Sequence, residues 1–294
     1  MHPASLRAAF ANCRKVSARH GRTYYLATLL LPAWKRPYVH ALYAFARCAD
    51  ELVDNPVADP ARALAAWREE SLAELAAGVS SHPVRAAVVE TARRWSIPVS
   101  HFEDFLDAMA MDLTVTSYAA YDDLRTYMHG SAAVIGRQML PILDPLDASA
   151  AAYAEDLGIG FQLTNFVRDV GEDLRRGRVY LPQEDLDHFG VTRADLASGV
   201  ADARVRRLLA YEVARAREVL RAAEPGIRLL HPTSRDCVRT ALTLYGGILD
   251  EVERAGYDVL DRRVAVGLRR RAYIAGNGLV RARFSQRRSA RTSP

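Results

Sequence analysis

The segment QLTNFVRDVGEDLRRGRVYLP (162–182) carries a regular set of polar side chains inside an otherwise apolar stretch. Spacings of three, four and four residues place them on one face of a predicted α-helix. The four residues are Gln162, Asn165, Asp169 and Asp173. A solvated helix face would explain a single isolated D-x-x-x-D pattern equally well.

A second acidic pattern weakens that simpler explanation. In RCADELVD (47–54), Asp50 and Asp54 are four residues apart and project from one helix face, where their charges repel. The preceding turns hold small or apolar residues, among them Ala44 and Phe45, which indicates partial burial. Buried carboxylates are costly unless a partner neutralises them, and a divalent cation does so.

The ligand atoms in both patterns are oxygens, and each pattern lies beside an arginine. Oxygen donors without imidazole or thiolate select Mg²⁺ or Mn²⁺ over Zn²⁺. Magnesium takes one or two carboxylates and fills its other positions with water and substrate phosphates. The sequence therefore predicts a magnesium-bound diphosphate between two acidic helices.

Working outward, helical periodicity covers most of the chain and no alternating strand pattern of comparable length occurs. The predicted helices span 6–19, 37–53, 60–77, 83–94, 101–113, 124–140, 149–174, 202–223 and 233–255. The breaks between them hold turn residues such as Asn55-Pro56 and Glu224-Pro225-Gly226. We expect an all-α fold in which residues 1–294 form a single domain, with a basic C-terminal tail at about 280–294.

Charge and targeting signals narrow the class of protein. The formal net charge is +5, and only Lys15 and Lys35 are lysines, so nearly all the positive charge is guanidinium, which binds phosphate in a bidentate way. No secretory signal is visible, and the longest apolar run, 24–34, is about half of the roughly 20 residues that a spanning helix needs. Three cysteines without ligand spacing fit reduced thiols. We expect a cytoplasmic protein without a membrane span.

Several common catalytic patterns are missing. Neither a G-x-G-x-x-G nor a G-x-x-x-x-G-K-[ST] string occurs, and there is no H-E-x-x-H or G-x-S-x-G. The chemistry is therefore expected to depend on carboxylates. The other acidic residues Asp104, Asp107 and Asp112 are predicted to be structural or to face solvent.

Two of these segments also carry a family resemblance. LYAFARCADELVD (42–54) and 162–182 resemble the two signatures of the squalene and phytoene synthases, and the pattern is nearest to the bacterial phytoene synthases. Further similarity lies in HGRTYYLATLLLP (20–32), YMHGSAAVIG (127–136), Tyr245 and AGYDVLDRRVAV (255–266). The first signature reads Asp50-Glu51 where two aspartates are frequent, which keeps a carboxylate.

The resemblance implies an isoprenoid synthase bundle of helices around a central cavity and assigns roles within it. The implied metal ligands are Asp50, Asp54, Asn165, Asp169 and Asp173. The implied diphosphate-binding residues are Arg22, Thr23, Arg47, Gln162, Asn165, Arg168, Arg178, Tyr180 and one of Arg262 or Arg263, with Arg263 preferred. The implied catalytic residues are the four aspartates with Tyr127 and Tyr245, whose ring faces stabilise a carbocation.

The implied reaction joins two molecules of geranylgeranyl diphosphate head to head, through a cyclopropyl diphosphate, to phytoene in carotenoid biosynthesis. It needs Mg²⁺, with Mn²⁺ as a substitute, and no NAD(P)H. One alternative uses farnesyl diphosphate to make squalene, dehydrosqualene or hydroxysqualene, and another is a single-substrate terpene cyclase. An alternative of a different class is a non-catalytic scaffold with the same fold.

The C-terminal segment suggests a lipid partner. From Arg262 to the end of the chain there are ten arginines and no acidic residue, interleaved with apolar residues. Such a segment suits peripheral attachment to an anionic membrane, where each basic residue contributes about 1 kcal/mol. Its final dozen residues are predicted to be a solvated, disordered end. Contact with neighbouring carotenoid enzymes is expected at the membrane, and no nucleic-acid partner is expected.

Overall fold

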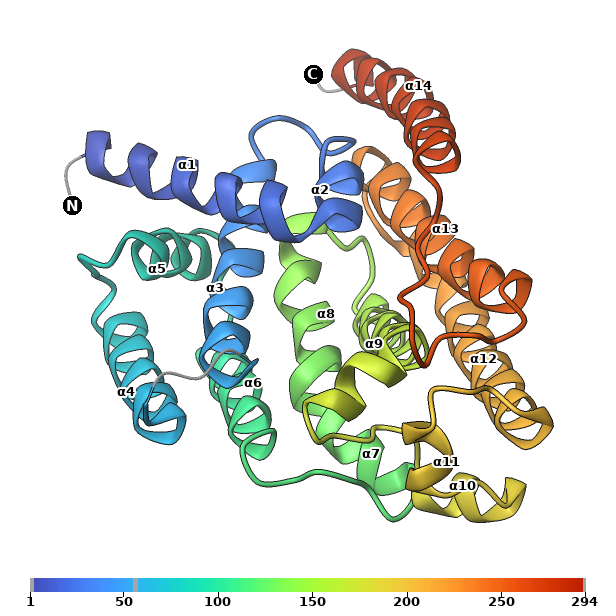
Figure 1. Ribbon diagram of the computed structural model, residues 1–294. Coiled ribbons are helices and arrows are strands. Elements are labelled where there is room, and N and C mark those ends of the chain that lie inside the picture. Colours follow the sequence, from blue (N-terminus) through green and yellow to red (C-terminus); the bar gives the residue numbers. More distant parts are fainter. Residues whose placement is uncertain (1–2, 55–57, 293–294) are drawn as a thin grey trace.

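The computed structural model describes residues 3–54 and 58–292, and its regular elements are helices (Figure 1). The α-helices are α1 (Pro3–His20), α2 (Arg22–Thr28), α3 (Arg36–Asp54), α4 (Pro60–Ala77), α5 (Pro83–Trp95), α6 (Ser100–Met111), α7 (Tyr121–Met128), α8 (Val134–Met139), α9 (Ala150–Arg175), α10 (Gln183–Phe189), α11 (Arg193–Ala197), α12 (Ala203–Ala223), α13 (Pro232–Arg254) and α14 (Leu268–Thr292). Short helical turns of other types are η1 (His129–Ala133), η2 (Leu140–Leu143) and η3 (Glu224–Leu229). Within the described ranges the only β pairing is an isolated bridge between Pro145 and Leu230. The predicted all-α class is confirmed.

Local signals explain where the best-predicted helix begins and ends. The Asp59 side chain accepts a hydrogen bond from the Arg62 amide, and Pro60 occupies the first helical position of α4. Gly78 ends the helix with a φ of 71°, a left-handed conformation that glycine adopts without strain. These caps give α4 the predicted bounds 60–77.

Helix α9 is the central element of the bundle and packs against α8, α12 and α13 (Figure 1). With 26 residues it is about 39 Å long at 1.5 Å per residue. Two glycines allow close packing: a Cβ at Gly136 of α8 would lie 2.0 Å from the Ala154 carbonyl oxygen of α9, and one at Gly158 of α9 would lie 2.3 Å from the Ala132 carbonyl oxygen of η1. The acidic residues of 162–173 therefore belong to a buried, tightly held helix.

The predicted helix 124–140 is interrupted in the structure. Helix α7 passes into the π-helical turn η1 and then into α8. At Gly130, in the π turn, a Cβ would lie 2.5 Å from the Asp104 carbonyl oxygen of α6. The apolar spacing continues through this widened turn, which explains why the sequence pattern predicts one helix.

The prediction of a disordered C-terminal end is wrong as far as Thr292, where α14 ends. Helix α14 lies beside α13 at the edge of the bundle (Figure 1). Its inward face is anchored because Ala282 is buried, Ser285 donates a hydrogen bond to Asp236, and Gln286 donates one to the Leu30 carbonyl. Small and polar residues on one face of α14 thus anchor it to the bundle. The many arginines in this segment make that packing face hard to recognise from the sequence.

Two further expectations concern thiols and membrane spans. Cys13, Cys48 and Cys237 are free, the first and last being buried and the middle one half-buried. No helix in the described parts of the chain is both long and apolar enough to cross a bilayer.

Candidate active site

The two acidic patterns lie at the C-terminal ends of α3 and α9, and arginines connect them. Asp54 of α3 accepts hydrogen bonds from Arg176 and Arg178, each at 2.8 Å, from the segment that directly follows α9. Asp54 is nearly buried, with a side chain 9% exposed. The structure therefore brings together two motifs that are more than 100 residues apart, as the sequence predicts.

Asp169 has a similar pair of arginine partners. Arg168 contacts it through Nε at 2.7 Å, and Arg263 forms an ion pair with it at 2.8 Å. The neighbouring Arg262 turns away and pairs with Asp258. Of the two arginines considered from the sequence, Arg263 is the one that reaches the aspartates.

A glycine explains how Arg263 reaches α9. A Cβ at Gly171 would lie 1.7 Å from the Leu260 carbonyl oxygen, so the segment after α13 rests directly on the α9 backbone. Arg263 follows three residues later. On the α3 side, Arg47 forms ion pairs with both Asp50 and Glu51.

The surroundings of two of the aspartates disfavour the ionised form of the carboxyl group. Burial, followed by repulsion from Asp54, raises the pKa of Asp50 to about 6. Burial, followed by repulsion from Asp169, raises the pKa of Asp173 to about 8. A bound cation would relieve both effects.

The donor set fits a hard divalent cation. Asn165 Oδ1 is buried and has no hydrogen-bond partner among the described residues, so an oxygen donor is free one turn before Asp169. In the described part of the chain, no three His, Cys, Asp or Glu side chains converge as a ready-made metal centre. Arginines hold the carboxylates instead, so the residues fit a cation that arrives together with phosphate oxygens.

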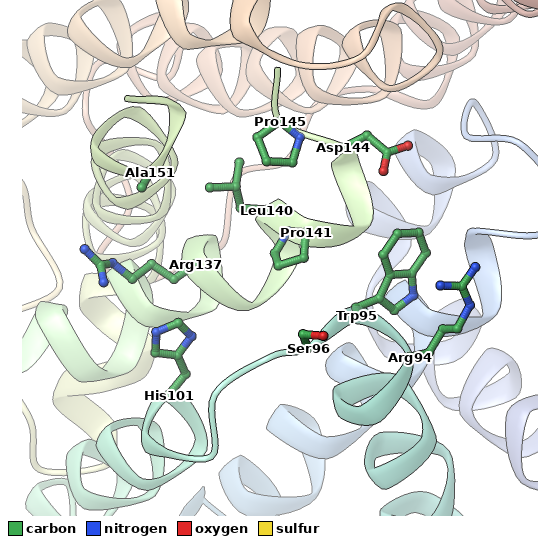
Figure 2. A pocket seen from close by; sticks show the side chains of 10 residues that line it. All are labelled: Arg94, Trp95, Ser96, His101, Arg137, Leu140, Pro141, Asp144, Pro145 and Ala151. Atoms are coloured by element: carbon green, nitrogen blue, oxygen red, sulfur yellow. The ribbon is translucent and has the colours of Figure 1, made fainter. Parts of the chain in front are cut away.

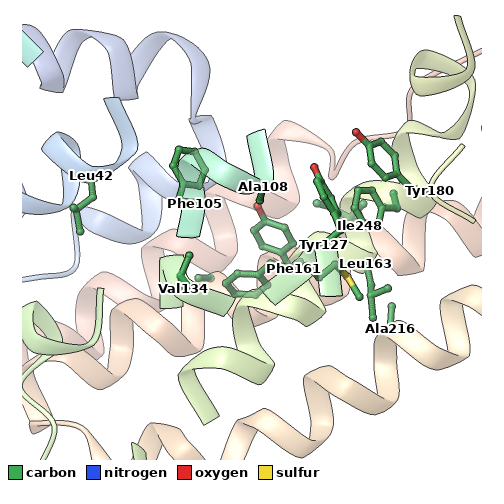
Figure 3. Close-up of a cluster of buried hydrophobic side chains, with 14 of the residues drawn as sticks. Leu42, Phe105, Ala108, Tyr127, Val134, Phe161, Leu163, Tyr180, Ala216 and Ile248 are labelled. Atoms are coloured by element: carbon green, nitrogen blue, oxygen red, sulfur yellow. The ribbon is translucent and has the colours of Figure 1, made fainter. Parts of the chain in front are cut away.

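Aromatic rings lie on both sides of α9 next to its acidic face. Tyr245 stacks on Phe161 with centroids 4.0 Å apart, and Tyr180 stacks on Phe166 at 4.2 Å. Tyr127 is 2% exposed, and the centroid of its ring lies 5.6 Å from that of Tyr180. Figure 3 shows both tyrosines in the buried cluster with Phe161. Burial raises the pKa of Tyr127 and Tyr245 well above the ordinary value, so both rings are neutral phenols.

Asp112 is a residue of this site that the sequence interpretation missed. It is half-buried, and its two carboxylate oxygens accept hydrogen bonds from Tyr127 and Tyr180, each at 2.8 Å. Burial raises its pKa. It lies just after the end of α6 in no recurring motif, so only the fold reveals it.

In the described part of the chain, some predicted site residues form no hydrogen bond or ion pair with the acidic groups. Arg22 is exposed and Thr23 half-buried at the start of α2, and within the described ranges neither side chain forms a hydrogen bond or ion pair. Gln162 is half-buried on α9, one turn before Asn165. Arg176 is not among the residues selected from the sequence, and yet it donates a hydrogen bond to Asp54. The sequence LRRGR does not show which of its arginines reaches the aspartate.

Two cavities help to locate the site. A cavity of about 10 Å³ is lined by residues that include Asp173, Arg178 and Tyr180. A larger pocket of about 490 Å³ lies between α5, α6 and α8, lined by residues that include Trp95, His101 and Arg137 (Figure 2). It also touches Ala151, at the beginning of α9, about 27 Å along that helix from Asp169.

This geometry places guanidinium groups, which bind phosphate, beside a buried aromatic interior. The family model for squalene/phytoene synthase matches residues 17–270. The chain belongs to the squalene/phytoene synthase family. Phytoene synthase of Arthrospira platensis is 40% identical over 279 residues, covering 90% of each chain. The 15-cis-phytoene synthase of Synechococcus elongatus is 39% identical with the same coverage.

Solved structures of other family members support the same assignment. Squalene synthase HpnC from Alicyclobacillus acidocaldarius is 31% identical with a TM-score of 0.79, covering 87% of this chain and 97% of that one. A dehydrosqualene synthase in complex with ligand has a TM-score of 0.88 at 26% identity, covering 95% and 98%. The squalene/phytoene synthase fold therefore accounts for nearly all of the chain.

Proposed function

We propose that this protein is a phytoene synthase, a prenyltransferase that joins two geranylgeranyl diphosphates head to head and converts the cyclopropyl diphosphate to phytoene. The observation that carries the proposal is the pair of facing D-x-x-x-D motifs bridged by Arg176 and Arg178. The bacterial relatives similar over 90% of their length are named phytoene synthases.

The arginines around the aspartates are the groups that receive the diphosphates. Ionisation of an allylic carbon–oxygen bond requires that the departing diphosphate be neutralised, and guanidinium groups do this in a bidentate manner. Arg47, Arg168, Arg178 and Arg263 line the two acidic motifs and take this role. Mg²⁺ held by Asp50, Asp54, Asn165, Asp169 and Asp173 supplies further charge neutralisation when bound.

The aromatic rings then face the hydrocarbon. An allylic cation needs an interior without competing nucleophiles, where ring faces stabilise positive charge. Tyr127 and Tyr245 are buried beside α9, so their faces are placed to stabilise the cation.

A second candidate uses farnesyl diphosphate, because the similar solved structures include a squalene and a dehydrosqualene synthase. The deciding experiment incubates the purified protein with Mg²⁺ and each diphosphate separately, without NAD(P)H, and analyses the extracted hydrocarbons. Phytoene from geranylgeranyl diphosphate is expected. Exclusive use of farnesyl diphosphate would replace the phytoene proposal, and no turnover of either substrate would favour a non-catalytic scaffold.

Peripheral attachment to an anionic membrane is part of the proposal, since substrate and product are lipids. The outward face of α14 carries Tyr273, Val280 and Phe284, which are 71%, 55% and 64% exposed and share one helix face. Arg269, Arg283 and Arg287 are exposed around them and form no ion pair within the described ranges. An apolar stripe flanked by unpaired guanidiniums suits an interfacial helix. Contact with neighbouring carotenoid enzymes would follow at the same membrane.

A further inference from the structure

Asp112 connects three separate chain segments through one carboxylate. Its Oδ2 accepts a hydrogen bond from the Tyr127 hydroxyl of α7, and its Oδ1 accepts one from the Tyr180 hydroxyl in the segment after α9. A carboxylate is an acceptor only, so both phenol hydrogens must point at Asp112. Hydrogen bonds to an ionised acceptor are about twice as strong as neutral ones.

The two tyrosines form one continuous layer of rings. Tyr180 is parallel to Phe166 within 11°, and Tyr127 lies within 28° of Tyr180. Both tyrosine side chains are at least nine-tenths buried. Fixing the two phenol oxygens on one carboxylate therefore fixes the orientation of the ring faces.

The same chain segment also carries a diphosphate-binding arginine. Arg178, two residues before Tyr180, forms the ion pair with Asp54, and between them the Val179 amide donates a hydrogen bond to the Thr116 carbonyl. The position of the ring layer is thus coupled to the position of the guanidinium that receives the leaving group.

We propose that Asp112 is a positioning residue, which holds Tyr127 and Tyr180 with their ring faces toward the hydrocarbon and their hydroxyl groups turned away from it. The carbocation then meets π faces and not phenol oxygens or water. An ordinary core would not need a carboxylate here, because burying one is costly and an apolar side chain would pack as well. The inference rests on the proposed prenyl-transfer function.

The test measures kcat, KM and products for D112N, for Y127F/Y180F and for the triple variant, with D107N as the matched control. Asp107 lies on the exposed side of α6, paired with Arg68. We expect D112N to lower kcat about tenfold or more, to leave KM within about twofold, and to raise the share of prenyl alcohols formed by water capture. In the Y127F/Y180F background, D112N should add less than about twofold, since Asp112 acts through the two hydroxyls.

Two results would overturn the proposal. One is wild-type turnover and products in D112N. The other is that D112N lowers turnover as much in the Y127F/Y180F background as it does in the wild-type protein. If D112N does not fold, the Y127F/Y180F protein must show the same shift toward alcohols. Near-UV circular dichroism provides a readout that does not need turnover, because D112N should weaken the tyrosine signal and D107N should not. A wild-type protein inert to both diphosphates would overturn the proposed function, while the dichroism would still test whether Asp112 orders the rings.

Discussion

Gly171 and Leu260 are in such close contact that a Cβ on the glycine would lie 1.7 Å from the leucine carbonyl oxygen. This contact places the segment that carries Arg263 against the acidic face of α9, where Arg263 pairs with Asp169. The absence of one side chain therefore determines the position of one charge in the site.

Replacing Gly171 with alanine should displace that segment and its arginine. We expect turnover to fall about 100-fold, as for a displacement of about 1 Å in an active site, and the free energy of unfolding to fall by about 1–3 kcal/mol. Steady-state kinetics and urea unfolding check this. The control is G276A, since no described atom outside the α14 backbone lies within 4 Å of a Cβ at Gly276, and alanine there should be neutral or stabilising by about 0.5–1 kcal/mol. Equal effects of the two substitutions would refute the packing argument.

Substituting Asp50 or Asp169 with asparagine should abolish turnover while the helical fold persists, because each change removes an anionic ligand at nearly constant volume. The structure separates their effects on stability. The raised pKa of Asp50 means that its charge is disfavoured, so D50N should be as stable as the wild type or more so at neutral pH. Asp169 is held by two arginines, so D169N should be less stable. Near-normal rates at saturating Mg²⁺ in both variants would remove the metal assignment.

Asp173 predicts opposite pH trends for stability and for metal binding. The pKa of Asp173 is about 8 in the folded chain, against an ordinary value of 3.8. At a pH between these two values, the Asp173 carboxyl group is protonated in the metal-free folded protein and deprotonated in the unfolded chain. Protonation of Asp173 therefore stabilises the folded state. Its contribution to the free energy of unfolding is complete below pH 3.8 and is lost as the pH rises through about 8. Mg²⁺ needs the charged form, so its affinity should increase from pH 6 to pH 8.

Thermal unfolding and calorimetric Mg²⁺ titration at pH 6, 7 and 8 would test this pair of trends. In D173N the free energy of unfolding and the Mg²⁺ affinity should both vary less with pH between pH 6 and pH 8. A wild-type Mg²⁺ affinity that is constant from pH 6 to pH 8 would contradict the assignment of Asp173 as a ligand.

Vesicle binding through α14 should depend on its unpaired arginines. In R269S/R283S/R287S, sedimentation with vesicles of acidic lipid at low salt should fall, because each basic residue contributes about 1 kcal/mol at such a surface. The control R206S/R207S/R221S removes three exposed arginines from α12 and should sediment like the wild type. High salt should release the wild-type protein. Equal wild-type recovery with acidic and neutral vesicles would exclude this role for the helix.

The sequence predicts the fold class and the acidic pair well because both depend on local spacing. The periodicity of 149–174 and the caps of 60–77 are carried by neighbouring residues, and so are the i, i+4 aspartates of α3 and α9. Helix α14 was harder to predict, since its stability depends on the fit of Ala282, Ser285 and Gln286 against other segments.

The site residues that were missed depend on distant partners. The sequence around Asp112 gives no indication of its role, because that role depends on hydrogen bonds from two tyrosines that are 15 and 68 residues away. The choice between Arg262 and Arg263 likewise depends on the Gly171 contact. Arg22 and Thr23 are assigned to the site by family resemblance alone, and among the described residues they form no hydrogen bond or ion pair with the aspartates.

The pairing of aspartates with arginines gives ligand binding the character of an ion exchange. Asp54 and Asp169 already have guanidinium counter-ions, so binding of a magnesium diphosphate would exchange one charged partner for another: the carboxylates would hold the metal and the guanidiniums the phosphate. Asp54 and Asp169 would each have a charged partner both before and after the exchange. A newly synthesised chain can thus complete its fold before it meets its metal, because these two carboxylates are already neutralised by arginines.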